Sequence, residues 1–274
     1  RAVWAGLPNQ TVLVWAEQGI GDEIMFGSVL QDLISISKKV ILLCDHRLIN
    51  IFKRSFPAGI EFVEKGKKVG EDLYDYHLPI GSLPRFFRPN KISFVKNANP
   101  YLFCSTSKVH EIRRTLQTPC AKTLVGISWQ TKSLLSGAMK RNISLAKLVT
   151  KFSNENVRLV NLQYGDVSDE IALVKQQTYR DIFEIPEIDK NDDLDGLSHL
   201  ISACDYIVTI DNFIAHLAGA LGKETKVLLP KNNDWRWALK NETSYWYKSV
   251  KLYRQDGKLN WQKHLEKINA EIGF

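Results

Sequence analysis

The chain has 274 residues, of which 44% are hydrophobic and 24% are charged, and its formal net charge is +7. This size and apolar content allow a large core, in one domain or in two domains of ordinary size. No run of about 18 to 20 apolar residues occurs and the first residues do not form a signal peptide, so we expect a cytoplasmic protein without a transmembrane segment.

The excess of positive charge predicts an anionic partner. A nucleotide diphosphate fits this charge, and so does peripheral association with an anionic membrane. Nucleic acid is disfavoured, because the basic residues alternate with acidic ones and form no stripe with stacking aromatic residues.

The cysteines and histidines form no recognisable metal site. Cys44, Cys104, Cys120 and Cys204 lie far apart, and the six histidines include no His-Glu-x-x-His motif. We expect free thiols in a reducing compartment, no metal and no other cofactor.

Strands and helices alternate in the first part of the chain. Apolar runs predict strands at residues 12–16, 40–43, 60–63 and 76–80. Helical periodicity predicts helices at residues 24–36, 46–56 and 107–116. This alternation is typical of a parallel, doubly wound sheet.

The alternation restarts after Pro119. Strands are predicted at residues 123–128, 157–162, 206–210 and 227–229, and helices at residues 145–152, 194–204, 213–221 and 261–272. The predicted fold class is therefore α/β, with two Rossmann-like domains facing across a cleft. The expected domains are residues 1–118 and residues 119–257, with residues 258–274 as a C-terminal helix that could pack back on the first domain.

The first candidate motif is Gln18-Gly19-Ile20-Gly21-Asp22, directly after a buried strand. Its two glycines permit a tight turn and close approach to a ligand, and the helix that follows offers free N–H groups. The third glycine of the dinucleotide fingerprint is absent, and so is the Lys-Ser/Thr of a P-loop. Asp22 is either a helix cap or a carboxylate that faces the cleft.

The second motif begins with Asp211-Asn212, again after a buried strand, and continues into a helix that carries His216. Helical side chains lean toward the N-terminus of their helix, so the His216 imidazole can reach a ligand bound there. A structural role for this histidine is the alternative.

The third motif is Lys140-Arg141, in a loop between a predicted strand and a predicted helix. An arginine fork and a lysine point charge could together clamp a diphosphate. Solvated surface charge is the other interpretation.

The fourth motif is Asp234-Trp235-Arg236-Trp237, followed by three aromatic residues at 245–247. The rings could stack on a base or a sugar, or they could pack a domain junction.

These motifs together resemble the glycosyltransferase segment often joined to tetratricopeptide repeats in bacterial proteins, which is similar to the heptosyltransferases of lipopolysaccharide synthesis. The resemblance spans Trp4 to about Leu265. It implies a GT-B architecture, with the acceptor bound by the first domain and the nucleotide-sugar donor by the second. The start of the chain without Met agrees with an upstream helical-repeat domain.

By the same resemblance, Asp22 is the catalytic base. The acceptor-side loop would consist of Gln18, Gly19 and Gly21, and the donor-binding residues would be Lys140, Arg141, Gln163, Asp211, Asn212, His216, Asp234 and Arg236. The chain departs from the family pattern at Asn212, where relatives usually have Thr or Ser, and at residues 130–139.

The predicted activity is inverting, metal-independent transfer of a sugar from a nucleotide-sugar donor to a hydroxyl of a glycan, a lipopolysaccharide or a protein. One alternative is a nucleotide-sugar epimerase on the same fold. Another is a non-catalytic module that binds a nucleotide sugar or serves as a scaffold.

Overall fold

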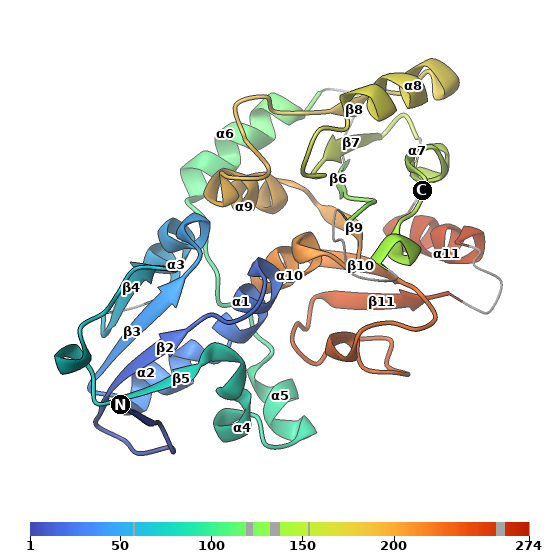
Figure 1. Cartoon of the computed structure of the whole chain (residues 1–274). Helices are drawn as coiled ribbons and strands as arrows, with labels where there is room; N and C mark the ends of the chain where they lie inside the picture. The colour runs from blue at the N-terminus through green and yellow to red at the C-terminus, as the bar shows by residue number, and fades with distance from the viewer. Residues whose placement is uncertain (57, 119–122, 132–137, 153, 256–260, 274) are drawn as a thin grey trace.

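The computed structural model describes residues 1–56, 58–118, 123–131, 138–152, 154–255 and 261–273, and consists of two α/β units (Figure 1). The first unit is built on a five-stranded parallel sheet in the order β1-β5-β2-β3-β4. Its strands are β1 (Ala2–Val3), β2 (Thr11–Trp15), β3 (Lys39–Cys44), β4 (Ile60–Glu64) and β5 (Tyr76–Pro79).

The second unit is built on a six-stranded parallel sheet in the order β11-β10-β9-β6-β7-β8. Its strands are β6 (Thr123–Ile127), β7 (Val157–Asn161), β8 (Ile182–Phe183), β9 (Tyr206–Ile210), β10 (Glu224–Leu229) and β11 (Val250–Arg254). Counted from β6, this is the Rossmann strand order, in which the chain direction across the sheet reverses between β6 and β9.

Helices cover both sheets. The described helices of the first part are α1 (Ile20–Gly27), α2 (Leu30–Ile36), α3 (Ile49–Ser55), α4 (Pro84–Phe87), α5 (Lys91–Asn97) and α6 (Thr106–Leu116). Those of the second part are α7 (Leu145–Phe152), α8 (Ser168–Thr178), α9 (Leu194–Ala203), α10 (Phe213–Ala220) and α11 (Gln262–Ile272). Short 3₁₀ turns include η1 (His46–Leu48), η4 (Ala138–Arg141) and η5 (Trp235–Trp237). No helix in the described ranges combines the length and the apolar content of a membrane span.

The prediction of two parallel α/β sheets is confirmed, and every predicted strand is present. The single helix predicted at residues 24–36 is wrong, because the chain forms α1 and α2 with a break at Ser28 and Val29. The hydroxyl of Ser28 donates to the carbonyl of Met25 at 2.7 Å, a side-chain bond that competes with the helical ladder. The elements not anticipated are α4, α5, α8, β1, β8 and β11.

Two helices near the predicted domain boundaries, α6 and α11, pack on the second unit. Helix α6, expected in the first domain, packs on α9 of the second unit, where Arg113 pairs with Asp205 at 2.8 Å. Helix α11 packs on α7 and on the second sheet, with Lys151 bonded to Glu266 at 2.9 Å, and in the described part of the chain it does not return to the first unit. The boundary residues 119 and 257–258 lie outside the described residues.

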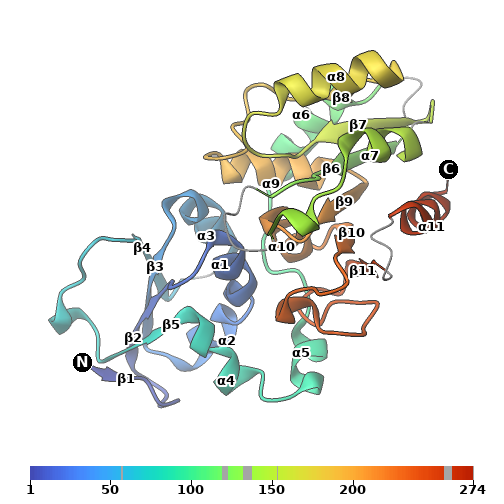
Figure 2. The ribbon, with the colours of Figure 1, turned by 45° about the vertical axis from the view of Figure 1, so that its right-hand side comes forward.

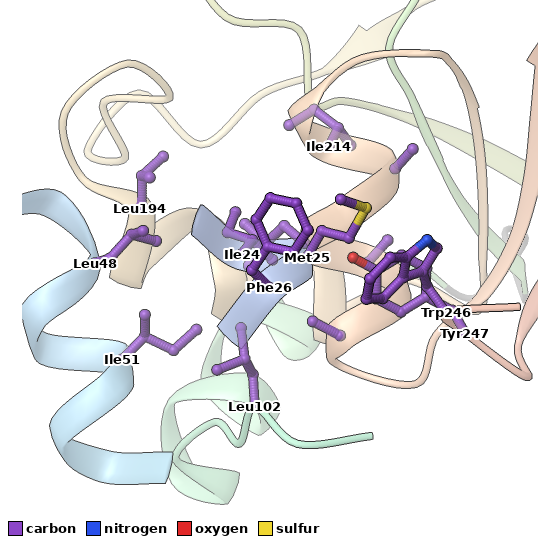
Figure 3. Close-up of a cluster of buried hydrophobic side chains, with 14 of the residues drawn as sticks. Ile24, Met25, Phe26, Leu48, Ile51, Leu102, Leu194, Ile214, Trp246 and Tyr247 are labelled. Atoms are coloured by element: carbon purple, nitrogen blue, oxygen red, sulfur yellow. The ribbon is translucent and has the colours of Figure 1, made fainter. Parts of the chain in front are cut away.

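The two units share one apolar core where α1 packs against α10 (Figure 2). The side chains of α1 lie at the centre of this core. Around them are Ile214 of α10, the pair Trp246 and Tyr247, and Leu48 of η1 (Figure 3). Each α1 residue of this cluster is at most 3% exposed. Apolar packing on this scale joins the units into one body at the place where the ends of their strands meet.

Candidate functional site

Eight of the twelve predicted site residues line a hollow at the carboxyl ends of β2, β6, β9 and β10. Ligands of open α/β sheets bind at such ends, where the strand order reverses, and both sheets present a reversal point to this hollow. Its volume is about 290 Å³. The lining residues are Gly21, Asp22, Thr131, Arg141, Tyr164, Asp211, Asn212, Phe213, His216, Asp234 and Arg236.

Asp22 stands in the first turn of α1. The N-cap of this helix is Gly19, so Asp22 does not occupy the capping position. Its Oδ1 accepts a hydrogen bond from Nε of Arg236 at 2.6 Å and also contacts Nη2 of that arginine. Burial raises the pKa of Asp22, and the Arg236 guanidinium opposes this rise. The result is a half-buried carboxylate with an elevated pKa at the edge of the hollow, as a general base requires.

Gly21 lets α1 approach α10 closely. A Cβ at this position would lie 3.2 Å from Cδ2 of His216 and 3.6 Å from the backbone of Phe213. A side chain would therefore push the two helices apart. The second glycine of the motif thus sets the distance between Asp22 and the second unit.

Asp211 is buried at the end of β9 and is held within the second unit. Its Oδ1 accepts from Nε1 of Trp237 at 2.7 Å, and its Oδ2 lies 3.3 Å from Nη1 of Arg141. Burial raises the pKa of Asp211, while the Trp237 hydrogen bond and Arg141 lower it. Arg141 and Asp211 thus line the hollow as an ion pair.

Asn212 caps α10. Its Oδ1 accepts from the backbone N–H of Ile214 at 3.0 Å, and its Nδ2 donates to the hydroxyl of Ser128 at 2.8 Å. A Thr or Ser could cap the helix, but it could not also donate an amide N–H to Ser128. Asn212, which stands where the relatives usually have Thr or Ser, therefore joins the start of α10 to the end of β6 by hydrogen bonds.

His216 is buried on α10 and stacks on Trp237 with 4.9 Å between ring centroids. Its Nδ1 lies 3.1 Å from the hydroxyl of Tyr247. Burial lowers the pKa of His216 to about 3, and the positive charge of Arg236 adds to this effect. The imidazole is therefore neutral near pH 7, so it offers the hollow a polar ring and no positive charge.

Some residues of the fourth motif line the hollow, and others pack in the core between the two units. Trp237, Trp246 and Tyr247 are buried, as a domain junction requires, whereas Trp235 is 59% exposed. Arg236 lies over the Trp235 ring, 5.0 Å from its centroid, and its Nη1 donates to Asp234 at 2.6 Å.

Four of the predicted site residues, Gln18, Gly19, Lys140 and Gln163, lie outside the lining of the hollow. The side chain of Gln18 accepts from Nη2 of Arg236 at 3.1 Å, and Gly19 is the N-cap of α1. Lys140 is exposed on η4, beside Arg141.

Gln163, the fourth of these residues, was also predicted to bind the donor. Its Oε1 accepts from the hydroxyl of Ser128 and from two backbone N–H groups at 2.9–3.0 Å, and its Nε2 donates to two carbonyls at 3.1 Å. It braces the loops after β6 and β7. Residues 132–137 of the expected donor loop lie outside the described residues.

Sequence reasoning did not identify Thr131, Tyr164 or Phe213 as lining residues. Tyr164 follows the end of β7 and Phe213 follows Asn212, so proximity to a strand end could have identified both. Three carboxylates and two arginines line the hollow. Among the described residues, no group of three or more His, Cys, Asp or Glu side chains is arranged to hold a metal ion.

No protein-family model matches the chain. Protein FlbA of Caulobacter vibrioides is 27% identical over 286 residues, an alignment that covers 98% of this chain and 48% of FlbA. The chain therefore spans about half the length of this curated relative.

Several solved glycosyltransferase structures are similar in fold. ADP-heptose lipopolysaccharide heptosyltransferase II of E. coli has a TM-score of 0.62 and 14% identity, over 95% of this chain and 98% of that one. A family 9 glycosyl transferase of Veillonella parvula has a TM-score of 0.61 and 12% identity, over 92% and 87%. E. coli heptosyltransferase WaaC with ADP-2-deoxy-2-fluoro heptose has a TM-score of 0.56 and 10% identity, over 96% and 100%. The chain thus has the two-domain GT-B fold of these heptosyltransferases.

Proposed function

We propose that the protein is an inverting glycosyltransferase that moves a sugar from a nucleotide-sugar donor to a hydroxyl acceptor. The observation that carries this proposal is the position of Asp22. Its carboxyl has a raised pKa and lines the hollow onto which both sheets open at the points where their strand order reverses. The GT-B fold supports it, since WaaC and heptosyltransferase II are named for heptosyl transfer. The transfer takes place in a single displacement.

On the acceptor side, Asp22 accepts the proton of the hydroxyl as its oxygen attacks the anomeric carbon. Burial keeps the pKa of this carboxyl above its ordinary value, which makes the carboxylate a stronger base. Gly19 leaves the approach to Asp22 free of a side chain, and Gly21 lets α1 lie close to α10.

On the donor side, the leaving nucleotide diphosphate lies near Arg141 and the start of α10. Arg141 supplies positive charge, and the backbone N–H groups of the helix start supply hydrogen-bond donors. His216 acts as a neutral polar contact, because its pKa of about 3 keeps it uncharged. The hollow of about 290 Å³ accommodates the reacting sugar and phosphates, with Lys140 at its exposed margin. These charges make the transfer metal-independent.

A panel of nucleoside diphosphates and their sugars tests donor binding. Unfolding temperature is measured with UDP, ADP, GDP and CDP compounds, each with and without EDTA. A true donor at 100 times its dissociation constant should stabilise the fold by about 2.7 kcal/mol. The absence of a shift with every compound would overturn the proposal, and a shift that disappears in EDTA would contradict metal independence.

Product analysis separates transfer from its alternatives. A transferase forms a glycosylated acceptor and one equivalent of nucleoside diphosphate, with the anomeric configuration inverted. An epimerase changes the donor sugar without an acceptor. A binding module shows stabilisation without turnover.

A further inference from the structure

Arg236 crosses the boundary between the two units. It belongs to η5, which follows β10 of the second sheet, yet its guanidinium reaches α1 of the first unit. Nε donates to Oδ1 of Asp22 at 2.6 Å, and Nη2 donates to Oε1 of Gln18 at 3.1 Å. Nη1 remains with Asp234 of its own segment at 2.6 Å.

Arg236 binds Asp22 through one carboxylate oxygen. The ion pair and the side-chain hydrogen bond recorded for Asp22 both involve Oδ1. The other oxygen, Oδ2, lies beside Gly19, 4.0 Å from the position that a Cβ would take there. Because Gly19 has no side chain, an incoming hydroxyl can approach from this direction.

We propose that Arg236 is a positioning residue that acts through Asp22: it holds Oδ1 from across the domain boundary and directs Oδ2 toward the acceptor hydroxyl. This inference rests on the proposed function, in which Asp22 is the base. It assigns Arg236 to the acceptor side of the reaction, whereas the family resemblance implied donor binding.

The hydrogen bonds that Arg236 donates support this assignment. Its three nitrogens are engaged with Asp22, Gln18 and Asp234, and the side chains of Asp22 and Arg236 are only 16% and 17% exposed. A diphosphate would have to displace a buried carboxylate to obtain this guanidinium. The side chain of Arg141 is 25% exposed and, among the described residues, donates to Asp211 through Nη1 alone, whereas Arg236 uses all three of its nitrogens.

The charges that face Asp22 give the proposal a measurable consequence. Arg236 lowers the pKa of Asp22, and Asp234, which shares the same guanidinium, raises it. The other groups nearby are the backbone of Gly19, the un-ionised Tyr247 hydroxyl and the neutral His216 ring beside Gly21. Arg236 of η5 and Asp234, the N-cap of η5, therefore act on the pKa of Asp22 in opposite directions.

Three variants test this opposition: Arg236→Gln, Arg236→Lys and Asp234→Asn. Carbon-13 NMR follows the titration of the Asp22 carboxyl, whose signal is identified by its absence in Asp22→Asn. The pH dependence of kcat/KM is measured in parallel. Lys175→Gln serves as the matched control, since it removes one positive charge from an exposed pair with Asp181, remote from α1.

Arg236→Gln should move the Asp22 titration and the acid limb of kcat/KM to higher pH, and Asp234→Asn should move both to lower pH. Because a neighbouring opposite charge commonly lowers a carboxyl pKa by about 1 to 3 units, kcat/KM of Arg236→Gln on the acid limb should fall at least about tenfold. Arg236→Lys should restore part of the titration shift, because it keeps the charge but not the planar fork. Lys175→Gln should leave both readouts unchanged.

An Asp22 titration that does not move in Arg236→Gln, or that moves in the same direction in Arg236→Gln and Asp234→Asn, would overturn the role of Arg236. The NMR titration requires no turnover. A wild-type protein that transfers no sugar would therefore refute the proposed function, while the titration would still decide whether Arg236 controls Asp22.

Discussion

The two sides of the hollow are built alike but are held together differently. Each begins with a buried parallel strand that leads through a short turn into a helix, and each has one aspartate near the start of that helix. Asp211 finds its partners, Trp237 and Arg141, inside its own unit. Asp22 finds its partner, Arg236, in the opposite unit.

Under the proposed function, this difference separates a supporting carboxylate, Asp211, from the proposed base, Asp22. Asp211 accepts from the indole of Trp237, which is 1% exposed and would otherwise have no acceptor for its N–H group. Asp22 pairs with an arginine that also bonds to Asp234 and Gln18, so the guanidinium keeps partners when Asp22 is replaced. We therefore expect mutations on the two sides to affect different properties.

The largest expected effect is on the rate of transfer. Asp22→Asn should lower kcat by about 10² to 10⁴, because the amide cannot accept the acceptor proton. The measurement is initial-rate kinetics with the donor found in the binding panel. Asp181→Asn, at an exposed position of the second unit, is the control and should keep the wild-type rate. A wild-type rate in folded Asp22→Asn would show that Asp22 is not the base.

The next largest effect is on stability and concerns Asp211, on the other side of the hollow. Asp211→Ala should reduce the free energy of unfolding by about 1 to 3 kcal/mol, because the buried Trp237 N–H loses its acceptor. Asp22→Ala should change this free energy by less, since Arg236 retains Asp234 and Gln18. Urea unfolding at pH 7 measures both. Equal losses in the two variants would contradict the distinction between the two sides.

A smaller effect concerns pH and the neutral state of His216. Its pKa falls from an unfolded value of 6.5 to about 3 in the fold, so the folded state resists protonation. The contribution of the neutral His216 imidazole to the free energy of unfolding is fully present above pH 6.5 and is lost as the pH falls toward 3. Between pH 7 and pH 5 the loss should be about 2 kcal/mol.

His216→Gln isolates this contribution, because glutamine does not titrate. Urea unfolding at pH 7 and pH 5 should show a loss in wild type that exceeds the loss in His216→Gln by about 2 kcal/mol. His110→Gln, at an exposed position of α6, should follow the wild type. The same pH dependence in wild type and His216→Gln would mean that the imidazole is not buried in its neutral form.

The sequence determined the fold class and the approximate positions of the strands. Runs such as residues 12–16 and 206–210 must be buried, and short apolar runs that alternate with amphipathic helices favour parallel sheets. The same local patterns located Asp211 directly after a strand, and Asp22 and His216 in the helices that follow strand ends, where ligands of such sheets bind. These features depend on neighbours in the chain, so they can be inferred without a structure.

Only the tertiary structure decided which units the helices join and which side chains face one another. Local periodicity did not reveal that α11 packs on the second sheet or that Gln163 braces two loops. The partnership of Asp22 and Arg236 joins residues 214 positions apart. Whether a carboxylate is a cap, a support or a base depends on such partners and on burial, which arise only when α1 packs against α10.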